Sequence, residues 1–360
     1  AITNAKLATG ITASKLTGAL PAISAASLTN VPKDVTVGGR KNILKNGGFD
    51  VWQRGTSFSH TSGKNFICDR WWVNPSSVGG TQTRQSAGLD GFNYALRMQR
   101  TSGQSGTGLV YLNTEMESAD SMQFRGKKVT LSFYARKGAN FSQSSSQLTS
   151  NLATGTGTDQ TLQTGFTGGA NVISQNNTLT TSWQRFSHTT SSVLASTVNQ
   201  IAVQFTHSPA GTAGAADYYE ITGVQLEVGD TATDFEHRSY GEELALCQRY
   251  FYHQETNGSG EGYTYVLDGD HYPLLNVNFP VTMRAEPGFS SNMTSSHRFR
   301  IDSVSGVYGA WAEVDSVRTT NDAAVIKLGR NTNFVTSDLG VCGWCDSRAG
   351  TILVYFDAEL

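Results

Sequence analysis

Short segments in which apolar and polar residues alternate recur between residues 41 and 240, and glycine punctuates them. Residues 129–136 alternate valine, leucine, phenylalanine and alanine with polar residues, and residues 201–206 place isoleucine, valine and phenylalanine at every second position. A period of two puts the apolar side chains on one face of a strand, so each segment predicts a half-buried strand. Many short strands without intervening helices predict a β-sandwich rather than a parallel α/β sheet.

The tract between Lys137 and Arg185 contains one charged residue, Asp159, among many serine, threonine, glutamine and glycine residues. A long flexible loop and polar-faced strands both fit this composition. Pieces that contain threonine, leucine or tryptophan, at 162–166 and 178–183, favour strands.

Composition excludes several classes of function. Charged residues make up 16% of the chain, against about 25% in an average soluble domain. The net charge of −2 provides no field that attracts nucleic acid or an anionic membrane, and the few adjacent bases form no continuous basic run. No apolar run approaches the roughly 20 residues needed to cross a bilayer. A polar but weakly charged surface is typical of extracellular adhesins and fibres.

Several separated segments together resemble the carbohydrate-binding-module-like β-sandwich of phage fibre proteins. They are Gly47–Gly55, Cys68–Trp72, Thr181–Phe186, Ile221–Gly229 and the closing phrase Asp234–Tyr250. The resemblance covers about residues 41–252 and implies a virion structural or adhesion protein. Such a protein needs no secretion leader, because phages leave the cell by lysis. We accordingly expect none, although the chain begins at Ala1 without methionine.

Residues 1–40 contain no aromatic residue and carry a near-repeat, in which 2–7 (ITNAKL) is echoed by 11–16 (ITASKL). The apolar spacing of three to five residues matches neither a heptad seam nor strand alternation. A single such strand cannot bury its own apolar side. A disordered linker is one interpretation. We favour the other, an extended N-terminal oligomeric stalk in which three chains wrap around an axis, because these segments resemble phage fibre shafts.

The remaining chain is predicted as a helical joint at 241–252 and a second β domain at 253–360, the candidate receptor-binding tip, after a jelly-roll-like sandwich at 41–240. Glu242 and Glu243 complement a helix N-terminus. The cluster at 234–238 predicts an ion-paired connection between strand and helix. The apolar run 352–356 predicts a strand that is central in its sheet or buried against another chain. The expected fold class is therefore all-β.

Aromatic residues supply the candidate glycan-binding sites. Trp71 and Trp72 are adjacent, so in a strand they point to opposite faces, and an exposed indole would stack on a sugar. The alternative places the second indole under a loop. Trp52 and Trp183 are predicted as core residues. The C-terminal candidates are Tyr263, Tyr265, Tyr272, Trp311 and Trp344.

The sequence predicts no cofactor. Relatives of the sandwich often hold a structural calcium between acidic residues of the first and last strands. Asp50 matches the first position, but Thr222 and Gly223 occupy the last, so calcium at Asp50 is the minority interpretation. The four cysteines, at 68, 247, 342 and 345, are predicted as reduced apolar fillers, since neither a disulfide framework nor a second zinc-ligand pair is evident.

Catalytic signatures are missing from the sequence: it has no nucleophile elbow, zinc-protease motif, P-loop or dinucleotide fingerprint. The predicted function is therefore a non-enzymatic phage fibre or spike, exposed on the virion, that attaches to host surface glycan. Its expected partners are two further copies of the chain and other virion proteins bound through the N-terminal segment. The alternatives are a capsid-attached head fibre or decoration protein, a polysaccharide-degrading tailspike and a secreted bacterial lectin.

Overall fold

A computed structural model describes residues 40–256, 262–263, 274–291, 298–303, 306–311, 314–328, 340–344 and 352–360. Side chains are described within 40–254, 276–291, 316–326 and 354–360. The predicted stalk, apart from its last residue, lies outside the described residues. Residues 40–360 form one compact unit.

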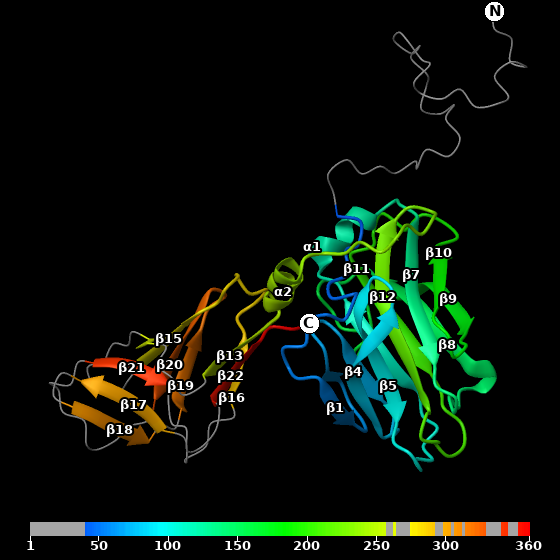
Figure 1. The fold of residues 1–360 in the computed structure, drawn as a ribbon. Coiled ribbons are helices and arrows are strands. Elements are labelled where there is room, and N and C mark those ends of the chain that lie inside the picture. The colour runs from blue at the N-terminus through cyan, green and yellow to red at the C-terminus, as the bar shows by residue number, and fades with distance from the viewer. Residues whose placement is uncertain are drawn as a thin grey trace, which may run out of the picture. The chain divides into compact units, whose positions relative to one another are not determined.

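Two six-stranded antiparallel sheets build the sandwich (Figure 1). The first has the order β1-β4-β5-β12-β7-β10, with strands β1 (Ser57–His60), β4 (Gly80–Leu89), β5 (Phe92–Arg100), β12 (Tyr218–Val228), β7 (Val129–Lys137) and β10 (Gln184–Thr189). The second has the order β2-β3-β6-β11-β8-β9, with strands β2 (Asn65–Phe66), β3 (Trp72–Pro75), β6 (Val110–Glu115), β11 (Gln200–His207), β8 (Gln147–Gly155) and β9 (Ala170–Thr178). Three pairs of neighbours, β4 with β5, β2 with β3 and β8 with β9, are consecutive in the chain, and the other neighbours come from distant parts of the sequence, as in a jelly roll.

The sandwich core confirms that the alternating apolar residues face inward, although Thr130 and Ser132 on the other face of β7 are buried too, so this strand is not half-buried as predicted. Leu131 and Phe133 of β7 and Val203 and Phe205 of β11 are fully buried in one hydrophobic cluster. The Phe133 and Phe205 rings meet edge to face, with centroids 4.8 Å apart. The strands that the sequence predicted at 129–136 and 201–206 therefore face each other across the two sheets.

Strand β12 is buried on both faces, and the segment at 42–48 pairs with the backbone of its C-terminal half. The backbone N–H of Val224 donates to the carbonyl of Gly47 at 2.9 Å, and Ile43 N–H donates to Leu226 O at 3.3 Å. A Cβ at Gly47 would lie 2.1 Å from the Val224 carbonyl oxygen. Glycine is thus required where the backbone approaches this closely. Two of the segments that carried the family resemblance lie side by side here.

The polar tract at 137–185 forms strands β8 and β9, which confirms the strand interpretation but not the predicted positions. Residues 162–164 are a turn, and β9 ends at Thr178. The carboxylate of Glu115 accepts a hydrogen bond from Leu162 N–H at 2.6 Å and another from the Thr161 hydroxyl at 2.8 Å. This acceptor holds the chain in a turn that local strand propensity does not predict.

The helices are short. Helix α1 spans Ser118–Ser121, two 3₁₀ turns span Met122–Phe124 and Ser144–Ser146, and α2 spans Tyr240–Gln248. The helix predicted at 241–252 thus ends earlier, because the carbonyl of Tyr250 accepts a backbone hydrogen bond from Ala358 at 2.8 Å and Phe251 starts a strand. None of the described helices is long and apolar enough to cross a bilayer.

The C-terminal part contains three further antiparallel sheets (Figure 1). They have the orders β13-β22-β16, β14-β21-β17-β18 and β15-β20-β19. Their strands are β13 (Phe251–Thr256), β14 (Gly262–Tyr263), β15 (Leu274–Asn278), β16 (Gly288–Ser291), β17 (Arg298–Ser303), β18 (Gly306–Trp311), β19 (Val314–Thr319), β20 (Ala323–Leu328), β21 (Gly340–Trp344) and β22 (Ile352–Asp357). The apolar run at 352–356 is central in its sheet, as predicted. The all-β class with a jelly-roll-like sandwich is confirmed.

Candidate functional site

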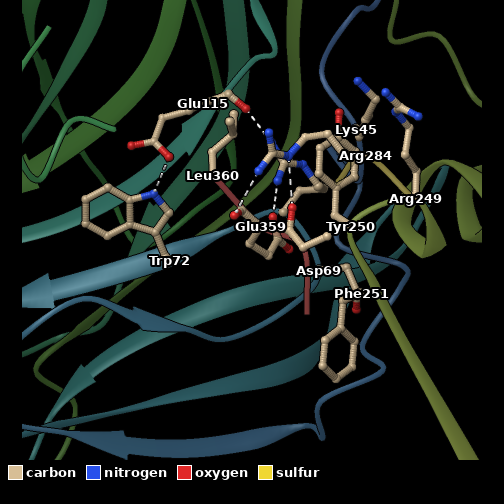
Figure 2. A network of polar contacts seen from close by, with 12 residues as sticks. Lys45, Asp69, Trp72, Glu115, Arg249, Tyr250, Phe251, Arg284, Glu359 and Leu360 are labelled. Carbon is tan, nitrogen blue, oxygen red and sulfur yellow. Dashed lines mark hydrogen bonds and ion pairs between the residues drawn. The ribbon is translucent and has the colours of Figure 1, made fainter. Parts of the chain in front are cut away.

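The two adjacent indoles that were predicted as a sugar platform are both buried. Trp71 is 0% exposed and Trp72 is 2% exposed. The indole N–H of Trp72 donates to Glu115 at 3.1 Å (Figure 2), and the ammonium of Lys64 lies 4.8 Å from the centre of an indole ring of Trp72. The expectation of one exposed indole is wrong, because these polar side chains and not solvent cover the second ring.

The two tryptophans that were predicted as core residues, Trp52 and Trp183, differ in burial. Trp52 belongs to the hydrophobic core and is 8% exposed. Trp183 is only half-buried: its N–H donates to the Ala87 carbonyl at 2.9 Å, and the guanidinium of Arg136 lies 4.7 Å from its ring. The core assignment is confirmed for Trp52 and wrong for Trp183, where an arginine covers a ring near the sheet edge.

The C-terminal candidates are not placed. Tyr265 and Tyr272 lie outside the described residues, and the side chains of Tyr263, Trp311 and Trp344 do too, although their backbones belong to β14, β18 and β21.

Two of the four cysteines are described with their side chains. Cys68 and Cys247 are free thiols and fully buried. Burial raises the pKa of both thiols well above the ordinary value, which keeps them protonated and unreactive. This agrees with their predicted role as apolar fillers. Cys345 and the side chain of Cys342 fall outside the described residues.

A cleft of about 650 Å³ is the strongest candidate site in the described part of the chain. Four parts of the chain line it: the β4–β5 pair, the loop at 50–53, α2 with the segment that leads into it, and β13 through His253. The polar and aromatic lining residues are Asp50, Trp52, Gln53, Arg84, Phe92, Asn93, Tyr94, His237, Arg238, Tyr240, Glu243, Gln248 and His253. Sequence reasoning singled out Asp50 only as a minority metal ligand and did not predict the cleft.

Strand alternation explains how β4 and β5 supply two of these side chains. Arg84 is the cross-strand partner of Leu96, and Tyr94 lies two residues before Leu96, so all three share one face of the sheet. Leu96 is fully buried in the core, whereas Arg84 and Tyr94 are half-exposed. The core-facing side of the sheet therefore continues beyond the core as a wall of the cleft. The Arg84 guanidinium lies 4.4 Å from the centre of the Tyr94 ring.

The loop that carries Asp50 is held in one conformation by Asn46. The Asn46 side chain donates to the carbonyls of Val51 and Asp69, both at 2.9 Å, and accepts from Val51 N–H at 3.0 Å. The indole N–H of Trp52 donates to Phe49 O at 2.6 Å. Asn46 has a φ of 57°, a left-handed conformation that asparagine tolerates better than most residues. The loop is therefore preorganised.

Helix α2 forms the opposing wall and is tied to the same loop. Glu243 accepts from Asn46 N–H at 2.6 Å and from the Arg238 guanidinium at 3.1 and 3.2 Å. Arg238 also donates to Leu44 O at 3.0 Å. Ser239 caps the helix by accepting from Glu242 N–H at 3.4 Å. The ion pair confirms the predicted ion-paired connection, and it leaves both carboxylate oxygens of Glu243 occupied.

The electrostatics of the cleft centre on Asp50. Burial raises the pKa of this carboxyl, the nearby Glu243 carboxylate raises it further, and His237 opposes the increase. Within the described part of the chain, no hydrogen bond reaches the Asp50 carboxylate or the Arg84 guanidinium. The cleft thus offers one acceptor group and one donor group that the protein itself does not use.

Aromatic rings pack beneath the mouth of the cleft. The Phe92 ring lies 5.1 Å from Phe235 and 5.2 Å from the His237 imidazole. Gly223 has a φ of 61°, and a Cβ there would lie 2.7 Å from the Phe92 ring. This glycine lets β12 pass under Phe92. Gly223 was noted in the sequence only for lacking a carboxylate, and the structure gives it this packing role.

A second polar cluster joins the sandwich to the C-terminal strands (Figure 2). The buried Arg70 guanidinium pairs with Glu359, donates to Glu115 O at 2.5 Å and lies 3.6 Å from the Tyr250 ring. Arg249 donates twice to Glu117, at 2.9 Å each. Burial opposes ionisation of Glu117, but hydrogen bonds from Arg249 and Tyr250 lower its pKa to about 2. Each ion is partnered, which indicates a structural joint rather than a ligand site.

The described residues contain no group of three or more histidine, cysteine, aspartate or glutamate side chains arranged to hold a metal ion. Among the described residues, Glu243 is the carboxylate that raises the pKa of Asp50, and it is already paired with Arg238. The donor set that this structure presents at Asp50 does not fit calcium, which takes six to eight oxygen ligands.

Comparisons with known proteins find a likeness among solved structures. No protein-family model matches the chain, and no curated protein matches it. Solved structures are similar at low identity. A sugar-binding protein from Bacteroides thetaiotaomicron, itself described as putative, is 12% identical, with a TM-score of 0.33 and coverage of 52% of this chain and 100% of that one.

Two further similar structures illustrate the range. The C-terminal family 22 carbohydrate-binding module of Clostridium thermocellum Xyn10B is 11% identical, with a TM-score of 0.30, and the match covers 46% of this chain and 89% of that one. The enzymatically active domain of tailspike protein 4 from bacteriophage CBA120 is 10% identical, with a TM-score of 0.31, and the match covers 52% of this chain and 21% of that one.

Proposed function

We propose that the cleft between β4–β5 and α2 binds a glycan, and that the chain is a non-enzymatic fibre or spike protein of a virion. The observation that carries the glycan part is the combination of aromatic rings with uncommitted polar groups. Tyr94 is half-exposed, Tyr240 is 61% exposed, and among the described residues no hydrogen bond reaches the side chain of Asp50 or of Arg84. Sugars present apolar ring faces and many hydroxyls, so they need both kinds of contact.

Binding is favoured over hydrolysis because only one of the two cleft carboxylates, Asp50 and Glu243, is free of a protein partner. Glycoside hydrolysis commonly uses two carboxyl groups, one on each side of the scissile bond. Glu243 is engaged by Arg238 and by Asn46 N–H, so it is not free to attack a sugar or to activate water. A polysaccharide-degrading tailspike remains the alternative, and release of reducing ends from host glycan would establish it.

The virion assignment rests on the sequence resemblance of residues 41–252 to fibre proteins. In this proposal the N-terminal segment attaches to other virion proteins, and three chains present three clefts. Three weak sites on one particle raise the effective concentration of each and strengthen attachment without new contacts. A head fibre or decoration protein is the second candidate, and the location of the protein on intact particles distinguishes the two.

Alanine at Tyr94 is expected to weaken glycan binding about tenfold, equivalent to about 1.4 kcal/mol, because the stacking face is lost. Tyr218 is a matched control, since it is also half-buried and an arginine, Arg97, lies 4.1 Å from its ring, but it does not line the cleft. Titration calorimetry on both variants checks the proposal. Equal losses for the two variants, or binding by neither variant nor wild type, would contradict it.

The trimer is tested separately. Light scattering on the full chain is expected to give three times the monomer mass of 38.7 kDa. A version that starts at Asn42 is expected to be monomeric if residues 1–40 hold the trimer together. A monomeric full chain would contradict the proposal, and a trimeric short version would move the association to the C-terminal part.

A further inference from the structure

The chemistry of the cleft walls also bears on which glycans it accepts. The lining carries two acidic side chains, Asp50 and Glu243, and two guanidinium groups, Arg84 and Arg238. One pair neutralises itself, because Arg238 binds both oxygens of Glu243. That leaves the Asp50 carboxylate and the Arg84 guanidinium to contact a ligand. Their charges are opposite, so apart from the histidines these free groups carry no net charge.

The Asp50 carboxylate is placed to act as an acceptor. Ionised, it has two oxygens and no donor, which suits two neighbouring hydroxyl groups that each donate one hydrogen bond. Hydrogen bonds to an ionised acceptor are roughly twice as strong as neutral ones. Asn46 fixes the loop before a ligand arrives, so little ordering cost remains.

The Arg84 guanidinium supplies the complementary donors. It lies over the Tyr94 ring at 4.4 Å, which limits its freedom and leaves its N–H groups available at the edge. A sugar ring that contacts Asp50 through hydroxyl hydrogens has ring and hydroxyl oxygens left to accept from Arg84. A neutral sugar can hydrogen-bond to both Asp50 and Arg84, whereas a ligand carboxylate near Asp50 is repelled by its negative charge.

We propose that the cleft selects uncharged glycan residues that carry adjacent hydroxyls, with Asp50 as the residue that accepts from the hydroxyl pair and rejects acidic sugars. This inference rests on the proposed glycan binding and adds the class of ligand. The charged groups and histidines that line the cleft with Asp50 are Glu243 of α2, Arg238 and His237 of the segment before it, Arg84 of β4 and His253 of β13, and of these Glu243 and His237 act on the pKa of the Asp50 carboxyl.

The test uses an array of neutral and uronic-acid-containing oligosaccharides, in which each acidic member is paired with its carboxyl-reduced, neutral form. Wild-type protein at pH 7.5 is expected to bind neutral members and the carboxyl-reduced forms, and to bind the acidic forms at least tenfold more weakly. Asp50→Asn is expected to lose about tenfold in affinity for neutral members and to narrow the preference over acidic ones.

Asp90→Asn is the matched control, because Asp90 is exposed in the turn between β4 and β5, next to the cleft, but does not line it. This variant also removes one negative charge. It is expected to change neither the affinity for neutral members nor the preference for them over acidic ones. Equal effects of the two variants, or equal wild-type binding of acidic and reduced forms, would overturn the inference while glycan binding stands. Failure of the wild type to bind any member would overturn both proposals. If Asp50→Asn does not fold, as judged by its circular dichroism, the paired wild-type comparison still decides.

Discussion

Alanine in place of Trp71 is expected to lower the free energy of unfolding by about 3–5 kcal/mol, the usual cost of removing a large buried aromatic side chain. The indole is 0% exposed, and its ring lies 5.0 Å from Phe49 and 6.4 Å from Phe205. Its N–H donates to Asn46 O at 3.1 Å, so the change also leaves that buried carbonyl with one partner fewer. Urea unfolding followed by fluorescence measures the loss.

Trp183→Ala is the control for this prediction. That indole is half-buried under Arg136, so its removal is expected to cost less than about 2 kcal/mol. Trp52→Ala belongs with the core variants, because Trp52 is 8% exposed and packs in the main cluster. Similar losses at positions 71 and 183 would contradict the burial that the structure assigns to them.

Methionine in place of Arg70 is expected to destabilise the protein by about 3–5 kcal/mol, because it leaves the Glu359 carboxylate buried without its main partner. The two side chains are 3% and 2% exposed. Arg54 lies 3.4 Å from Glu359 and keeps a weaker contact with it in the variant. The loss of stability is therefore expected near the lower end of this range. Thermal and urea unfolding of the single variant give the magnitude.

The double variant Arg70→Met with Glu359→Gln separates the ion pair from packing. Replacing both charges removes the unpaired ion, so the double variant is expected to recover at least half of the stability that Arg70→Met loses. Strictly additive losses would show that the two side chains do not interact. The cycle measures the interaction energy between Arg70 and Glu359, a contact that no sequence pattern predicted.

The polar contacts of Lys64 and Glu115 explain why the sequence expectation for Trp72 was wrong. Trp72 was predicted as a possible sugar platform from its position in a strand, where its side chain points away from Trp71. Alternation was right about direction but could not show that Lys64 and Glu115 would fill that side. These contacts join residues about 8 and 43 positions apart, and no local pattern encodes them.

Sequence alone determined the fold class and the core strands. The alternation at 129–136 and 201–206 sets which side chains face inward, because a strand presents successive residues to opposite faces. It also predicted that Trp52 is buried, that a helix begins near residue 241 and that an ion-paired connection leads into it. Each of these follows from short-range periodicity or from residues within one helical turn, which a linear pattern contains.

Tertiary structure alone decided where the cleft lies and which charges remain free within it. Asp50, Arg84 and Glu243 are far apart in sequence and meet only because β4, the 50–53 loop and α2 converge. Asp50 and Glu243 have the same kind of side chain, yet Arg238 occupies one and leaves the other open. The availability of a charge depends on its spatial neighbours, so the sequence predicted the sandwich but could not predict its site.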